Sequence, residues 1–314
     1  MNNKRNGLLE IYRFILCFWP LYYHNFFFFE RDYSKFTVAE LAVDCFFVLS
    51  GFFLMRAMQR EKDSPVFKGM LNMMFGRVKP MAFTMCFIVA FNLACIVLFI
   101  RADYIDVLFD LFKYWWFVLY LVIGIGLIYL VYRLVKSEKI FIVFLVILAA
   151  AMATLQYLVV EKNMFINELV FVARTLACVP VGILISYIPA YKPKKFNIGI
   201  PVVAILIPLM LYIAYIEKTF LMRILMVAMF CALIYFSCSI NVGGPVFDLI
   251  GKLSVRMYLY MAFITMLEIL GLTNHRILFV INVALASLDL IVDYYRQKYK
   301  ALKRKTEKAE QHLG

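Results

Sequence analysis

The chain has 314 residues, of which 65% are hydrophobic, and its mean hydropathy is +0.84. A soluble globular protein is about 45–50% apolar, so this composition excludes an ordinary soluble domain. The formal net charge of +13 could indicate a nucleic-acid partner. We exclude nucleic acid because the basic residues are sorted by their position between apolar blocks.

Apolar blocks recur along the whole sequence, and about 20 residues of helix are enough to cross a bilayer. This pattern predicts an all-α, polytopic integral membrane protein with about ten transmembrane helices. The first block is too long for the apolar region of a signal peptide and lacks a small-residue cleavage site, so we expect it to be the first span. The predicted spans are 8–29, 37–55, 80–100, 114–132, 140–160, 168–188, 197–216, 220–240, 246–270 and 276–293.

The basic residues predict the topology of these spans. Lys and Arg are concentrated at the N-terminus, in the even-numbered loops and after the last span, and they are sparse in the odd-numbered loops. The positive-inside rule therefore places both termini in the cytoplasm. We expect residues 1–295 to form the transmembrane domain and 296–314 a basic cytoplasmic tail, most simply an anchor on anionic membrane lipid. A specific partner for this tail is the alternative.

The first predicted span carries three ionisable residues, although such side chains are expensive inside a bilayer. Glu10 lies one helical turn before Arg13, a spacing that permits a local ion pair. Arg13 and His24 are separated so that they fall within about 20° of one helix face and roughly 16 Å apart along the axis. Pro20 between them can bend the helix. A single membrane His can equally be a hydrogen-bonded packing residue.

The second span contains Asp44, followed by Ser50 and Gly51. An acid at this depth requires a partner, and His24, Arg174 or a hydroxyl are the candidates. Gly51 can simply allow two helices to approach closely.

Basic and aromatic residues stand at the start of the next two spans. Arg77 and Lys79 lie where the third span begins; residues of this kind can snorkel to the interface, or they can hold the phosphates of an anionic ligand. Trp115 and Trp116 at the start of the fourth span are typical of an interfacial aromatic belt.

Two stretches near the N-terminus resemble the acyltransferase-3 family of bacterial integral-membrane acyltransferases. Glu10, Arg13 and His24 are similar to the first-helix pattern of that family, which has an acid, an Arg three residues later and a His eleven after that. The stretch from Ala42 to Leu54 resembles its sequence of a small residue, Val and an acid, then paired Phe and Ser-Gly-Phe. The second match is the most specific.

Two further blocks carry the same resemblance. The stretch 77–80 resembles the second half of the family's Arg-x-x-Arg motif and its following Pro, and 251–259 resembles its late Gly-x-hydrophobic-Ser-x-x-x-Tyr-Leu block. Trp116 stands close to the usual position of a family Trp. The sequence departs from the family at Met74, which replaces the first Arg of the motif, and at Met261, where the late block normally ends in His.

The resemblance implies a membrane-bound O-acyltransferase that moves an acyl group, usually acetyl, from an acyl-CoA to a hydroxyl of a surface polysaccharide or lipid-linked sugar. His24 is then expected to be the general base and Asp44 to orient its imidazole, although His24 could instead carry the acyl group transiently. The expected donor-binding residues are Arg13, Arg77, Lys79 and Trp116, and the supporting residues are Glu10, Ser50, Ser254 and Tyr258.

The same resemblance implies acetyl-CoA or another acyl-CoA as co-substrate, with no bound cofactor, a glycan acceptor, and a role in exopolysaccharide biosynthesis at the bacterial cytoplasmic membrane. We expect no metal site, because the cysteines fall in predicted spans without a C-x-x-C pair. Two alternatives stay open. A transporter would use the buried charges as a substrate path, and a catalytically degenerate relative is suggested by Met74 and Met261.

Overall fold

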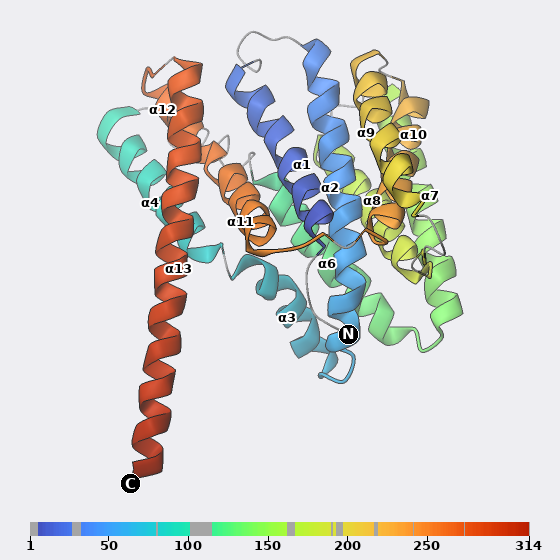
Figure 1. Cartoon of the computed structure of the whole chain (residues 1–314). Helices are drawn as coiled ribbons and strands as arrows, with labels where there is room; N and C mark the ends of the chain where they lie inside the picture. The colour runs from blue at the N-terminus through green and yellow to red at the C-terminus, as the bar shows by residue number, and fades with distance from the viewer. Residues whose placement is uncertain are drawn as a thin grey trace.

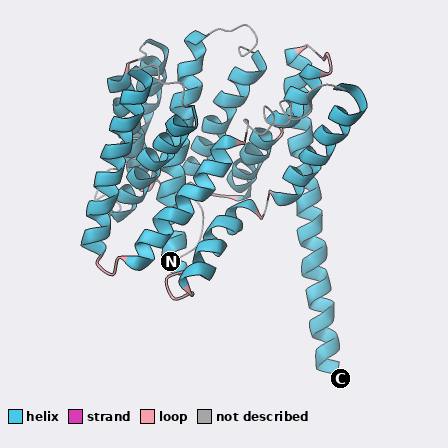
Figure 2. Cartoon of the chain, turned by 180° about the vertical axis from the view of Figure 1, so that it is seen from behind, coloured by secondary structure: helices cyan, strands magenta, loops and turns pink. Residues whose placement is uncertain are grey.

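The computed structural model describes residues 6–26, 33–79, 81–100, 115–161, 167–189, 191–192, 197–216, 219–240, 242–272 and 274–313. The described chain is helical and contains no strand (Figures 1 and 2), which confirms the all-α class. The helices are α1 (Gly7–Phe26), α2 (Tyr33–Arg60), α3 (Val66–Val78), α4 (Ala82–Cys95), α6 (Trp116–Leu134), α7 (Glu138–Glu161), α8 (Asn167–Tyr187), α9 (Gly199–Ile216), α10 (Phe220–Ser237), α11 (Pro245–Leu259), α12 (Met261–Ile269) and α13 (His275–Leu313), with a π-helical turn η1 (Ile96–Ile100) after α4.

Seven segments of the described chain are long and apolar enough to cross a membrane, which confirms a polytopic membrane protein. Val118–Leu134 and Gly199–Ile213 are shorter apolar helices that coincide with predicted spans, whereas the total of ten stays a prediction. The seven segments are Ala39–Arg60, Ala82–Phe99, Glu138–Val159, Leu169–Tyr187, Phe220–Ser237, Pro245–Ile269 and His275–Tyr299.

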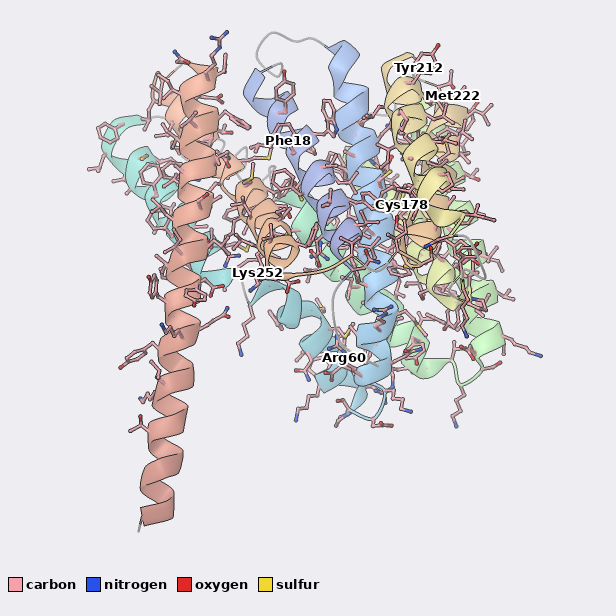
Figure 3. All side chains as sticks on the ribbon, viewed as in Figure 1. Phe18, Arg60, Cys178, Tyr212, Met222 and Lys252 are labelled. Atoms are coloured by element: carbon pink, nitrogen blue, oxygen red, sulfur yellow. The ribbon has the colours of Figure 1, made fainter. Side chains whose placement is uncertain are left out.

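Large apolar side chains cover the outside of the bundle (Figure 3). On α9, for example, Ile205 and Tyr212 are 64% and 63% exposed. Exposed apolar surface on this scale indicates contact with a partner or with lipid. In a chain with several membrane-spanning helices, lipid is the simplest explanation.

The structure differs from expectation between the second and third spans, where we predicted a loop over residues 56–79. α2 instead continues to Arg60, and α3 follows after a short turn at the lower end of the bundle in Figure 1. α3 exposes Phe67 and Phe75 and buries Met73. A short helix with an exposed apolar face at the end of a bundle is typical of a helix that lies in the membrane interface.

The last two predicted spans differ in the structure from the single helices of span length that their hydropathy predicts. The predicted span 246–270 forms two helices, α11 and α12, which are separated at Tyr260. α13 continues through residue 296 to Leu313 without interruption, so the basic tail is helical and extends beyond the rest of the bundle (Figure 1). α1 begins and α13 ends toward the same end of the bundle.

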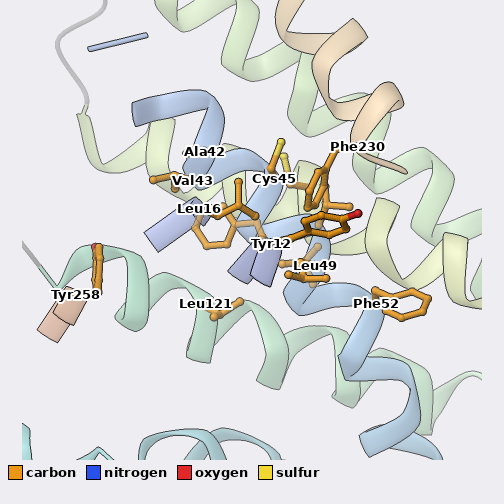
Figure 4. Close-up of a cluster of buried hydrophobic side chains, with 14 of the residues drawn as sticks. Tyr12, Leu16, Ala42, Val43, Cys45, Leu49, Phe52, Leu121, Phe230 and Tyr258 are labelled. Carbon is orange, nitrogen blue, oxygen red and sulfur yellow. The ribbon is translucent and has the colours of Figure 1, made fainter. Parts of the chain in front are cut away.

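The centre of the bundle is held by a close contact between α2 and α8. A Cβ on Gly51 would lie 2.1 Å from the carbonyl oxygen of Val179, and a Cβ on Gly182 would lie 1.9 Å from the carbonyl oxygen of Val48. Each glycine therefore admits the backbone of the facing helix, which confirms the packing expected for Gly51. Around this contact lies a core of apolar side chains from several helices (Figure 4).

Candidate functional site

The polar residues of α1 face α11 across a tight interface. The carboxylate of Glu10 is 2% exposed and lies directly against Gly251, where a Cβ would be 1.8 Å from its Oε2. That Oε2 accepts a 2.8 Å hydrogen bond from Nη1 of Arg13. The guanidinium of Arg13 also lies 5.0 Å from the ring centroid of Phe53 on α2, an arrangement that stabilises a cation. The ion pair expected between Glu10 and Arg13 is confirmed.

The interface continues one turn further along both helices. The buried hydroxyl of Ser254 donates to the carbonyl of Gly251 (2.9 Å). Tyr258 on α11 and Cys17 on α1 are also buried, and the two helices pack against each other. The first-helix block and the late block of the sequence therefore form two facing stripes.

His24 belongs to α1, and helix geometry places it on the same stripe as Arg13 and Cys17. Its side chain lies outside the described residues. The same holds for Arg77 in α3 and for Trp116 at the start of α6. Their predicted roles therefore stay predictions.

The structure also describes two further predicted residues, one exposed and one buried. Lys79 is exposed at the C-terminal end of α3, where its backbone N–H donates to the carbonyl of Phe75 (2.7 Å). Ser50 is buried on α2.

Asp44 joins a second cluster, which connects α2, α8 and α10. Nε of Arg174 donates to Oδ1 of Asp44 and its Nη1 donates to Oε1 of Glu40, both at 2.9 Å. Arg223 pairs with the other oxygen of Glu40 and lies 3.5 Å from Oδ2 of Asp44. Two acids and two arginines make the cluster formally neutral, which is how buried charges are tolerated in a membrane.

Arg174 is confirmed as a partner of Asp44. The predicted role of Asp44 in orienting His24 stays a prediction, because the side chain of His24 is not described. Sequence reasoning missed Glu40 and Arg223 as cluster members. Glu40 lies one turn before Asp44, and two acids at that spacing at the start of an apolar block were the available signal.

A third polar network joins α11 to α13 and α4. Arg256 donates to Asp293 (2.8 Å) and lies 3.2 Å from Asp289. The hydroxyl of Thr84 also donates to Asp289. Sequence reasoning did not find these acids, although two Asp one turn apart in the last apolar block signal them. The network fixes α11, whose Ser254 faces α1.

A cavity of about 100 Å³ lies on the opposite side of α1. It is lined almost entirely by apolar side chains of α1, α2, α9 and α10, among them Leu16, Trp19 and Phe230. At its edge the hydroxyl of Tyr12 hydrogen-bonds that of Ser237 (2.8 Å). The cavity is therefore separate from the polar interface of α1 and α11.

Met74, which stands where the resemblance expects an Arg, packs between α3 and α6. A Cβ on Gly126 would lie 2.7 Å from Sδ of Met74. The substituted side chain therefore serves helix packing at this position.

Comparison with known protein families gives a match over nearly the whole chain. The acyltransferase-3 family model, described as an acyltransferase domain, matches residues 6–295. No curated protein and no solved structure matches the chain. The matched range contains all three polar networks and ends within α13. The chain therefore belongs to the acyltransferase-3 family and is a membrane acyltransferase.

Proposed function

We propose that this protein is an O-acyltransferase of the bacterial cytoplasmic membrane. It moves an acyl group, acetyl in the simplest case, from acyl-CoA to a hydroxyl of a surface polysaccharide or lipid-linked sugar. The observation that carries the proposal is the packing of α1 against α11, where Glu10, hydrogen-bonded to Arg13, lies directly against Gly251 in the same α11 block as the buried Ser254 and Tyr258.

Donor binding is assigned to the basic residues near the end of the bundle where α1 begins and α3 ends. Acyl-CoA is multiply anionic, and arginine binds phosphate through directed, charge-assisted hydrogen bonds. Arg13 supports this assignment because Glu10 fixes its orientation while about a fifth of its side chain stays exposed. Arg77, Lys79 and Trp116 are the other proposed contacts, and both termini are proposed to face the cytoplasm.

Acyl transfer is assigned to His24, which lies further along the same stripe. Its neutral imidazole takes the proton from the acceptor hydroxyl as the hydroxyl oxygen attacks the thioester carbonyl. A carbon–oxygen bond forms and the carbon–sulfur bond breaks. The CoA thiolate leaves and takes the proton back from the imidazolium, so the base is regenerated.

The proposal is tested with labelled acetyl-CoA and membranes that contain the full chain. Label is expected to reach a glycan or glycolipid with the wild type and with His312→Ala, a control in the tail beyond the family match. It is expected to be lost with His24→Ala at equal protein level. If His24→Ala still transfers label, His24 is not the general base.

A direct binding measurement separates the alternatives. If the wild type neither transfers label nor binds any acyl-CoA, the transporter or the degenerate scaffold replaces the enzyme. If the protein is a scaffold, the substitutions at Met74 and Met261 are the first candidates for the cause of the lost activity.

A further inference from the structure

Asn282 on α13 is a buried amide without hydrogen bonds. The residue is 0% exposed, and both its amide oxygen and its amide nitrogen lack a partner. Asn92, another buried amide, by contrast donates to the carbonyl of Ala262. Burying polar groups without partners is unfavourable, so Asn282 is placed to bind something that supplies them.

Packing places this amide beside the polar interface. α13 contacts α1, α11 and α12, and Leu278 and Ala286, one turn to either side of Asn282, are also 0% exposed. The Asn282 side chain therefore points into the layer that these helices form. The ion pairs of Arg256 with Asp289 and Asp293 hold this part of α13 against α11.

A ring contact fixes the height of Asn282 relative to α1. The rings of Phe279 and Phe18 are 5.8 Å apart, and the two helices run in opposite directions (Figure 1). Asn282 lies about 4.5 Å closer than Phe279 to the end where α1 begins. Its height is therefore between that of Arg13 and that of His24.

The chemistry required at this height follows from the proposed function, on which this inference rests. A donor with its phosphates near Arg13 and its thioester near His24 has its pantetheine arm in between. That arm carries amide groups, and an Asn side chain offers the complementary acceptor and donors. We propose that Asn282 hydrogen-bonds an amide of the pantetheine arm and thereby selects a CoA-type donor.

Binding of unreactive CoA to the purified protein in lipid nanodiscs tests this role. The comparison ligand is a CoA analogue in which ester oxygens replace the amide N–H groups of the arm. The wild type is expected to bind CoA about 10-fold more tightly than the ester analogue, as for one hydrogen bond to a buried group. Asn282→Leu is expected to bind the two ligands equally and to melt no lower than the wild type. Asn92→Leu, the matched control, is expected to melt lower and to keep the preference for CoA.

The possible results distinguish a failure of this inference from a failure of the proposed function. If Asn282→Leu keeps the wild-type preference, or loses the same affinity for both ligands, Asn282 does not bind the amide and the inference fails while the proposed function stands. If the wild type binds no CoA, the proposed function fails and the inference fails with it. Asn282→Ala repeats the comparison should the Leu variant not fold.

Discussion

The carboxylate of Glu10 on α1 fills the space that a side chain at Gly251 on α11 would need. A Cβ at position 251 would lie 1.8 Å from Oε2 of Glu10, and the same oxygen accepts the hydrogen bond from Arg13. The missing side chain on α11 therefore determines where the guanidinium of Arg13 is held.

Gly251→Ala is expected to displace Glu10 and to disturb Arg13. We expect it to lower the unfolding free energy by about 1–3 kcal/mol, as inserted carbon atoms do in a packed interface, and to weaken acyl-CoA binding. Thermal melting in detergent and a donor titration measure the two effects. Gly76→Ala is the matched control, because nothing lies within 4 Å of a Cβ at that helical position. Equal behaviour of the two variants would contradict the packing argument.

The cluster around Asp44 allows structural and catalytic roles to be separated. Among the described residues, Arg174→Met leaves Asp44 and Glu40 with Arg223 as their one cationic partner, and removing one partner of a buried ion pair costs about 3–5 kcal/mol. We therefore expect a large loss of melting temperature and of folded protein in the membrane. The conservative change Asp44→Asn keeps the size of the side chain and should melt less far below the wild type.

The pH profile of acyl transfer by Asp44→Asn then decides its role. If Asp44 orients His24, kcat is expected to fall and the acid limb of the profile to move to lower pH, because the imidazolium loses a nearby negative charge and the pKa of the base falls. A variant that transfers label with the wild-type profile would leave Asp44 as a residue that only holds α2 against α8 and α10.

Arg174 could be named from the sequence as one of three candidate partners of Asp44, beside His24 and a hydroxyl, because a buried acid requires a partner and few polar groups lie in the spans. Glu40 and Arg223 could not be assigned in the same way. They lie near the ends of apolar blocks, where long charged side chains normally reach water. Only the packing of α2, α8 and α10 turns them inward.

Hydropathy predicted the membrane class, but it could not predict where helices break or which helices contact each other, for physical reasons. It does not detect the separation of α11 and α12 at Tyr260, because both helices are apolar. It also does not detect α3, whose apolar residues lie on part of its surface and alternate with polar ones. The contact between Glu10 and Gly251 joins the two ends of the sequence, and periodicity within one helix carries no information about such a contact.

Restoring the family residue with Met74→Arg is expected to harm this protein. Sδ of Met74 lies against Gly126 of α6, so a longer charged side chain would be forced into a packed contact between α3 and α6. We expect a loss of about 1–3 kcal/mol in unfolding free energy and no gain in donor affinity. Met74→Leu, with a similar volume, should cost less than about 1.5 kcal/mol. A Met74→Arg variant that melts like the wild type and binds acyl-CoA more tightly would show that the position still serves donor binding.

Arg13→Lys tests whether Arg13 binds the donor or takes part in the chemistry. Lysine keeps the charge, but it lacks the planar group that both donates to Glu10 and lies over the ring of Phe53. We expect KM for acyl-CoA to rise about 10-fold, the equivalent of one charge-assisted hydrogen bond, while kcat changes little, because a contact made equally in the ground and transition states affects binding alone. Arg60→Lys at the exposed end of α2 is the matched control and should leave KM unchanged. A fall in kcat at constant KM would move Arg13 from the donor site to the reacting atoms.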